Sequence, residues 1–378
     1  TPTARPATTT TKDGRPADPS PDNVPYKSKD FLVVSAEGLK NGDPILLAGY
    51  PGRTSRYKLP SEIRFARDTN FPVRVADMQA DLATIAAATK GNAQYDVRYA
   101  SVVKSINNVL KKTQGLLDGF ARKDIAAIKD VQDAEFRAWL NQPANQKAAS
   151  KTLLADLDAV IAADMALSEE EFGWSVATNS DLLKSARTLY RLALEQQKPN
   201  AQRESGYQER DLSFIKARLN RLEQSFVASV DEARFVASLQ RYAKLGAKMH
   251  PQGLDPLLPA TASVGALYKQ TQLGDTATRI SWIGKDAAAF KASDDAFIKM
   301  EMESTDSILN VIESKYDQRE NIVGLASRGG LNLMARSLGM NCRHIDWNSP
   351  DRSGERGVND YFATGRDGRR RFSLILEP

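Results

Sequence analysis

The sequence predicts a mainly α protein, in which a large helical domain follows a short β-hairpin and precedes an irregular C-terminal tail. Three observations support this prediction. Between about residues 73 and 315, apolar side chains recur at steps of three, four and seven, which is the period of one helix face. Two short apolar runs bounded by turn residues precede that region. After about residue 326 these patterns fade, and the chain uses arginine without any lysine.

The hairpin prediction rests on two apolar runs, Phe31–Val34 and Ile45–Ala48. Glu37-Gly38 and Asn41-Gly42-Asp43 lie between these runs and supply the residues of a turn. Residues 1–30 are rich in threonine and proline, so we expect an irregular lead-in there. Residues 31–57 are therefore predicted to form the strands, and 58–316 the helical domain.

Several apolar stripes define the expected helices. Ser168 to Glu171 has the spacing of a capping box, which predicts a helix start. Asp294 and Asp295 are interpreted as charges at the N-terminus of another helix. The stripes are Val75-Met78-Leu82-Ile85, Tyr99-Val102-Ile106-Val109-Leu116-Phe120, Leu182-Ala186-Leu189-Ala193 and the long Leu212-Ile215-Leu219-Leu222-Phe226-Val230.

Composition excludes several classes of function. The chain has 378 residues with a net charge of +5, and no dense basic stripe that would indicate a nucleic-acid partner. No segment approaches the roughly 18 apolar residues of a membrane span, so none is expected. With Cys342 as the single cysteine and only His250 and His344, neither a disulfide framework nor a metal site is expected. We expect no cofactor.

Residue chemistry alone gives no complete active site. Neither histidine has a Gly-x-Ser-x-Gly turn nearby, and both are interpreted as surface residues. The chain also contains no HExxH motif, no Walker loop and no GxGxxG after a strand. No catalytic residue is therefore predicted within this chain.

Three separated segments are more specific. They are Gly49-Tyr50-Pro51-Gly52-Arg53-Thr54-Ser55-Arg56-Tyr57, Lys198-Pro199-Asn200-Ala201-Gln202-Arg203-Glu204-Ser205-Gly206-Tyr207-Gln208-Glu209-Arg210-Asp211 and Gly274-Asp275-Thr276-Ala277-Thr278-Arg279. From the residues alone, the second is a charged helix–helix connection with Asp211 as N-cap. Together, and in this order, they resemble the bacterial dipeptidyl-peptidase 7 and 11 family of serine peptidases, above all its dipeptidyl aminopeptidase BII branch. The resemblance covers about residues 12–315.

This resemblance implies a serine exopeptidase with a chymotrypsin-like double β-barrel and a large helical domain inserted between the barrels. Residues 31–57 would be the last strands of the first barrel, and 58–316 the helical domain that caps the cleft. The family's catalytic histidine, aspartate and serine would lie outside this sequence, which is then a fragment that is inactive by itself. Residues 317–378 do not resemble the family, and we interpret them as a frame-shifted or disordered tail.

One residue inherits a role from the resemblance. Asn108 matches the family's asparagine that binds the α-amine of the substrate. A carboxamide oxygen suits that role because it accepts a hydrogen bond from an ammonium without adding a counter-charge. At Lys112 the sequence departs from the family, which usually has asparagine there.

The implied partners are peptides with a free N-terminus, together with a possible second copy in a homodimer. The implied location is the periplasm or the cell surface. The competing hypothesis is a stand-alone helical domain that binds other proteins and has no catalytic activity.

Overall fold

The computed structural model describes residues 38, 40, 42, 43, 58–143, 145, 152–204 and 206–305. The chain divides into two compact units, residues 1–50 with 372–378 and residues 51–371. In the first unit, Gly42 has a φ of +96°, and the backbone N–H of Asp43 donates to the carbonyl of Lys40 at 3.1 Å. This is the turn expected between the two apolar runs. The predicted strands, the lead-in and the tail 317–378 lie outside the described residues.

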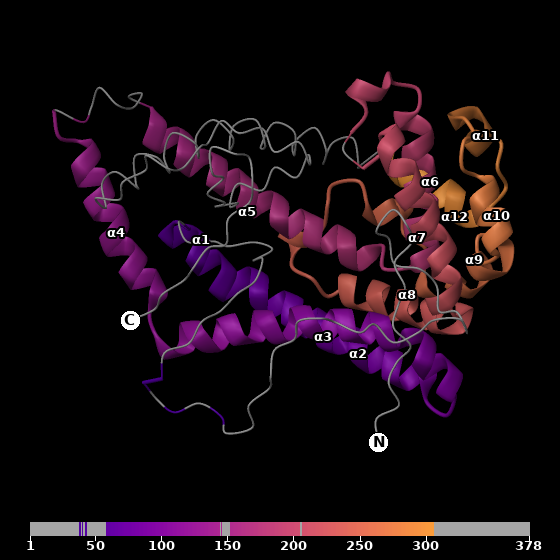
Figure 1. The fold of residues 1–378 in the computed structure, drawn as a ribbon, viewed down its shortest axis with the longest axis horizontal. Coiled ribbons are helices and arrows are strands. Elements are labelled where there is room, and N and C mark those ends of the chain that lie inside the picture. The colour runs from indigo at the N-terminus through magenta and orange to yellow at the C-terminus, as the bar shows by residue number, and fades with distance from the viewer. Residues whose placement is uncertain are drawn as a thin grey trace, which may run out of the picture. The chain divides into compact units, whose positions relative to one another are not determined.

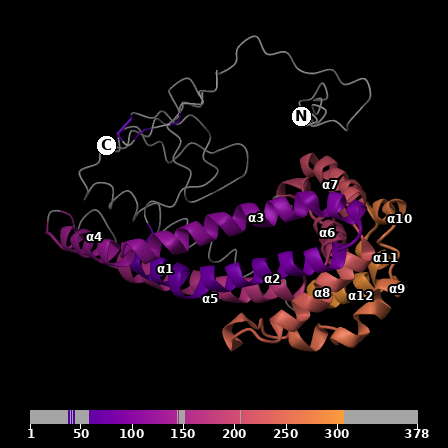
Figure 2. The ribbon, with the colours of Figure 1, turned by 90° about the horizontal axis from the view of Figure 1, so that it is seen from below.

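The second unit confirms the prediction of a mainly α protein (Figure 1). Helix α1 (Pro60–Phe65) continues through a π-helical turn, Ala66–Asn70, into α2 (Phe71–Thr89). Gly91, with a φ of +84°, then reverses the chain into α3 (Ala93–Arg122). Helices α2 and α3 pack side by side, as Figure 2 shows.

Helices α4 to α8 follow. Their bounds are Ile125–Leu140 for α4, Leu153–Ala177 for α5, Asp181–Glu195 for α6, Leu212–Ser225 for α7 and Ala228–Tyr242 for α8. The long stripe that was expected to form one helix is divided between α7 and α8. Phe226 and Val227 have extended backbone conformations there. The prediction of one continuous helix is therefore wrong after Leu222, because Phe226 lies in the break and Val230 belongs to α8.

Up to residue 305, where the described residues end, four short α-helices follow: α9 (Val264–Gln270), α10 (Thr276–Ser281), α11 (Ala287–Lys291) and α12 (Ala296–Ser304). Many helices begin at a side chain that accepts a hydrogen bond from the first turn, since this pairs amides that lack a helical partner. Asn92, Asp124, Ser180 and Asp295 do so for α3, α4, α6 and α12. The predicted position of Asp295 at a helix N-terminus is thus confirmed.

The predicted capping box at Ser168 is wrong. Ser168 lies inside α5, where its hydroxyl donates to the carbonyl of Asp164 at 2.9 Å, one turn earlier. A Ser-x-x-Glu pattern within a helix therefore has the sequence signature of a cap without being one. Glu169 and Glu171 are accordingly mid-helix side chains.

The main core lies where α6 packs against α7, α8 and the C-terminal helices. Its fully buried members include Leu183, Leu189, Phe235 and Phe297. A smaller core joins Ile85 of α2, Tyr99 of α3 and Val230 of α8, and thereby fixes α3 to the rest of the unit. None of the helices in the described ranges is long and apolar enough to cross a membrane.

Candidate functional site

A hollow of about 480 Å³ lies among α2, α3, α5, α6 and α8. It is lined mainly by charged and polar side chains: Asp77 and Asp81 from α2, Ser105 from α3, Ser175 from α5, Asp181, Lys184 and Arg187 from α6, and Arg234 from α8. Trp174, Val102 and Ile106 supply its apolar surface. The hollow is thus more polar than most ligand pockets, and it is its converging charged groups that make it a candidate site.

The inner wall of the hollow is an ion pair between α2 and α8. The Nε and Nη2 atoms of Arg234 donate to the two carboxylate oxygens of Asp81 at 3.0 and 2.9 Å. Both side chains are buried. Burial by itself raises the pKa of the Asp81 carboxyl, but the hydrogen bonds and charge of Arg234 outweigh it, so that pKa lies below its usual value. The pair is therefore ionised at neutral pH.

A second carboxylate, Asp231, lies behind this wall and is fully buried. It accepts hydrogen bonds from the Ser180 hydroxyl at 2.8 Å, the Asp181 backbone N–H at 2.8 Å and the Tyr268 hydroxyl at 2.7 Å. Burial, followed by the charge of Asp181, raises the pKa of Asp231 to about 6 despite these hydrogen bonds. Together, Asp81, Asp181, Asp231 and Arg234 form what we call the buried charge cluster.

The rim of the hollow is formed largely by α6. The Lys184 ammonium donates to the side-chain oxygen of Asn179 at 2.7 Å. The Arg187 guanidinium donates to the buried carboxylate of Glu301 at 2.8 Å and lies over the Trp174 ring, 4.6 Å from its centre. Both rim cations are thus held in place by neighbours.

Asn108, the site residue predicted from the sequence, lies on the exposed side of α3. It does not line the hollow, whereas Ser105, one turn earlier on the same helix, does. The neighbouring Asn107 is half-buried, and its side chain donates to the Val103 carbonyl at 2.9 Å. The Asn108 side chain is therefore exposed to solvent and is not part of the lining of the hollow.

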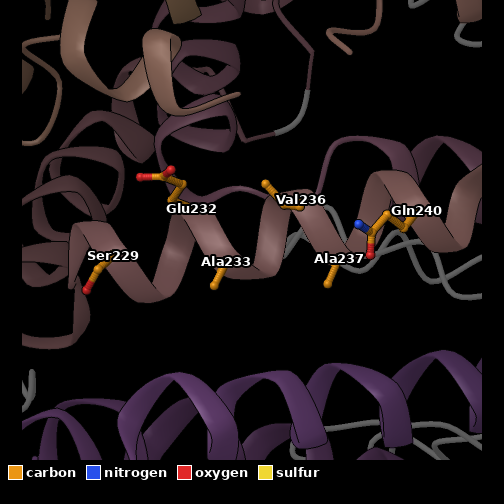
Figure 3. Close-up of a pocket in the computed structure, with 6 residues that line it drawn as sticks. All are labelled: Ser229, Glu232, Ala233, Val236, Ala237 and Gln240. Carbon is orange, nitrogen blue, oxygen red and sulfur yellow. The ribbon is translucent and has the colours of Figure 1, made fainter. Parts of the chain in front are cut away.

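A shallower groove runs along α8 (Figure 3). Ser229, Ala233 and Ala237 point to one side of the helix, and Glu232 and Val236 to the other. Its lining comes entirely from this one helix. We therefore take the hollow beside α3 as the candidate site.

The segment 198–211 is internally braced. The Glu195 carboxylate accepts from Lys198 Nζ at 2.7 Å and from the Glu204 backbone N–H at 2.8 Å. Asp211 immediately precedes α7, as expected for an N-cap, but its carboxylate accepts from the backbone N–H groups of Gly206 and Gln208. The charged residues of this motif therefore fix a connection between helices.

Arg279, the last residue of the third motif, is also structural. It is fully buried and donates to the carbonyl oxygens of Leu219, Leu273 and Gly274, at distances of 2.6 to 3.4 Å. Burial lowers the pKa of its guanidinium. Arg279 joins α10 to α7 through neutral acceptors. The first motif, Gly49 to Tyr57, lies outside the described residues.

His250 was expected at the surface, and it is half-exposed. Its Nδ1 atom lies 3.2 Å from a carboxylate oxygen of Asp255, and its ring centre is 4.3 Å from that of Tyr242. Within the described part of the chain, no group of three or more His, Cys, Asp or Glu side chains has the arrangement of a metal site.

The helical architecture also occurs in a protein structure that has been solved. It resembles the crystal structure of Porphyromonas endodontalis DPP11 in complex with the dipeptide Arg-Asp, with a TM-score of 0.55 and 18% identity. That alignment covers 88% of this chain and 47% of the DPP11 chain. At this identity, the likeness shows the fold.

Sequence comparison then gives the family. The family model Peptidase S46 matches residues 9–330, and the chain belongs to this family. The Asp/Glu-specific dipeptidyl-peptidase of Shewanella putrefaciens is 39% identical over 296 residues, which are 76% of this chain and 40% of that protein. Dipeptidyl-peptidase 7 of Capnocytophaga gingivalis is 32% identical over 148 residues, which are 39% and 21% of the two chains. The chain thus spans about two fifths or less of these two relatives. The family match ends at residue 330, whereas the resemblance was expected to end before residue 317.

Sequence reasoning missed the buried charge cluster. Asp81 and Arg234 are 153 residues apart, so no local pattern pairs them. A usable signal was present in α8, because Asp231 and Arg234 share the helix face of the buried Phe235 and Ser238. A charge on an apolar helix face predicts a buried partner.

Proposed function

We propose that residues 58–316 form the helical cap domain of a serine dipeptidyl peptidase, which releases dipeptides from peptides with a free N-terminus. The observation that supports this most strongly is the Peptidase S46 match over residues 9–330. The names of the similar proteins agree with it, since they are dipeptidyl-peptidases. In this proposal the cap covers the cleft, and the catalytic serine, histidine and aspartate come from outside the sequence described here.

In the proposed mechanism, the Asn108 carboxamide oxygen accepts a hydrogen bond from the substrate's α-ammonium. The exposed position of Asn108 on α3 is compatible with this role, because a substrate can reach it. Binding the N-terminus at a fixed distance from the serine sets the scissile bond after the second residue. The enzyme is then an exopeptidase because the bound α-amine fixes which peptide bond reaches the catalytic serine.

The test is Asn108→Ala in the whole protein that contains this chain. Losing a hydrogen bond to a charged group costs about 1.5–3 kcal/mol. We therefore expect kcat/KM for free-amine substrates to fall roughly tenfold to a hundredfold. Asn107→Ala is the matched control, since it removes only a bond within α3.

Two outcomes would argue against the role of Asn108. One is an unchanged kcat/KM in the variant. The other is an equal loss on substrates whose amine is acetylated, because those substrates cannot form the proposed bond. We also expect residues 1–378 alone to release no dipeptides, and measurable release by this chain would contradict that part of the proposal.

We extend the proposal to the periplasm or the cell surface as the location, and to a homodimer as the assembly. Fractionation of the native host and light scattering of the whole protein test these two points.

A stand-alone helical interaction domain is the second candidate. It is favoured by exposed apolar side chains, among them Val97, 76% exposed on α3, and Val131, 60% exposed on α4. Dipeptide release by the whole protein that is lost on Asn108→Ala would exclude this candidate. Absence of any such release, with a protein partner retained in a pull-down that Val97→Ser and Val131→Ser abolish, would favour it.

A further inference from the structure

The middle of α3 has an unusual charge pattern. Between Asp96 and Asp118 the sequence contains no aspartate or glutamate, although it contains Lys104, Lys111 and Lys112. On a helix surface, partners lie three or four residues apart. None of these three lysines has a carboxylate at those spacings. The pattern is therefore that of a helix face with positive charge and no local neutralisation.

The structure places these three lysines on the exposed side of α3. Among the ion pairs of the described residues, none involves Lys104, Lys111 or Lys112. Arg98, the remaining cation in this stretch, is used differently, since it donates to the carbonyl oxygens of Glu223 and Phe226 at 3.2 and 3.0 Å. Within the described part of the chain, no corresponding side-chain hydrogen bond is made by Lys104, Lys111 or Lys112.

The three lysines surround Asn108. They lie four residues before it, three after it and four after it, which are the spacings of neighbours on a helix surface. We call Lys104, Lys111 and Lys112 the lysine face. An ammonium held at Asn108 therefore approaches three like charges, and that repulsion falls when the same ligand also carries carboxylates.

We propose that the lysine face binds acidic side chains in the first residues of the peptide whose α-amine is held at Asn108. This inference rests on the proposed function for the role of Asn108, but not for the attraction of acidic residues itself. Three exposed lysines act at a range of about 8 Å at physiological salt. They would thus favour acidic N-terminal segments whatever residue precedes the scissile bond.

A peptide fits this surface better than a nucleic acid does. Grooves that bind single-stranded nucleic acid combine positive charge with exposed aromatic rings on which bases stack. The exposed residues between the lysines include Ser105, Asn108 and Val109, none of which has a ring. The net charge of the chain is only +5.

The test is binding of short peptides to this 378-residue chain. NMR line broadening of the peptide detects millimolar affinities, which suit a few exposed charges. Four hexapeptides form the probe set: Glu and Asp at the first three positions, or Gln and Asn there, each with a free or an acetylated N-terminus. The lysine-face variant is K104Q/K111Q/K112Q. The matched control, K216Q/K244Q/K248Q, removes three exposed lysines from α7 and from the segment after α8.

At low salt we expect the acidic peptides to bind the wild-type chain roughly threefold or more tightly than their amide counterparts. The lysine-face variant should lose this preference, the control should keep it, and about 0.3 M salt should remove it. Equal binding of acidic and amide peptides would overturn the inference, as would an equal loss in both triple variants. An oligonucleotide of equal charge that binds more tightly than the acidic peptide would overturn it too.

The two proposals fail separately in this design. If acetylation changes nothing while the acidic preference depends on the lysine face, the amine role of Asn108 is wrong and the lysine face stands. If free amines bind better but acidic residues do not, the reverse holds.

Discussion

The buried charge cluster and the lysine face use charge in opposite ways. In the cluster, Arg234 is 4% exposed and donates two hydrogen bonds to Asp81. Removing either residue therefore leaves the other charge buried, without this partner and out of reach of solvent. On the lysine face, three cations are exposed and have no ion pair among the described residues, so removing them costs the fold little. The comparison teaches that buried, paired charges hold the helices together, whereas exposed lysines without an ion pair among the described residues can be given to a ligand without loss of stability.

The largest expected effect comes from Asp81→Ala. Breaking a buried ion pair on one side costs about 3–5 kcal/mol, because the remaining ion stays desolvated. Among the ion-pair partners in the described residues, Arg234 would retain Asp181, whose carboxylate is 3.8 Å away. Urea unfolding followed by circular dichroism measures this loss in the free energy of unfolding.

Asp118→Ala is the matched control on α3. Asp118 is exposed and, among the described residues, its carboxylate accepts a hydrogen bond from Gln114 of its own helix at 2.9 Å, so we expect a change within about 0.5 kcal/mol. Equal losses for the two substitutions would break the comparison.

Two glycine-to-alanine substitutions should differ in sign. A Cβ atom at Gly173 of α5 would lie 1.6 Å from the backbone carbonyl oxygen of Met249, which cannot rotate away. We expect Gly173→Ala to cost about 3 kcal/mol. At Gly119 of α3 a Cβ atom meets nothing within 4 Å, so Gly119→Ala should stabilise by up to about 1 kcal/mol. Melting temperatures of the two variants provide the measurement. A decrease for Gly119→Ala would show that a side chain at this position meets a steric conflict, contrary to this expectation.

Asp231→Asn sharpens the comparison through pH. The folded-state pKa of Asp231 is raised from 3.8 to about 6, so the folded state binds this proton more tightly than the unfolded state does. The stability that results is fully present below pH 3.8 and is lost as pH rises through 6. Relative to the variant, the wild-type protein should therefore lose on the order of 2–3 kcal/mol between pH 4 and pH 7. Unfolding curves at four pH values test this, and a constant difference would contradict it.

The sequence predicted the helices well where apolar residues face a core. Ile85, Tyr99, Leu182 and Leu189 all belong to predicted stripes and are buried. Periodicity predicted these correctly because burial of one face is the same physical constraint in the sequence and in the fold.

The break between α7 and α8 was not predictable from the same signal. Phe226 continues the stripe in phase, and neither Gly nor Pro marks the turn there. Helix α7 ends where Arg98 of α3, more than 120 residues earlier in the sequence, donates hydrogen bonds to the carbonyl oxygens of Glu223 and Phe226. Arg98 thus caps the C-terminal end of α7. The candidate site escaped prediction for a related reason, since its charges are paired across long distances in the sequence.

Arg98 has a geometric consequence for α3. It fixes the start of that helix to the corner between α7 and α8, while Asn108 lies ten residues further along. At 1.5 Å per residue, this is a lever arm of about 15 Å. A tilt of only about 10° around the fixed end would therefore move Asn108 by roughly 3 Å, the length of one hydrogen bond. In the proposed function, the position at which a peptide's N-terminus is held would therefore depend on the angle of α3 at its anchored end.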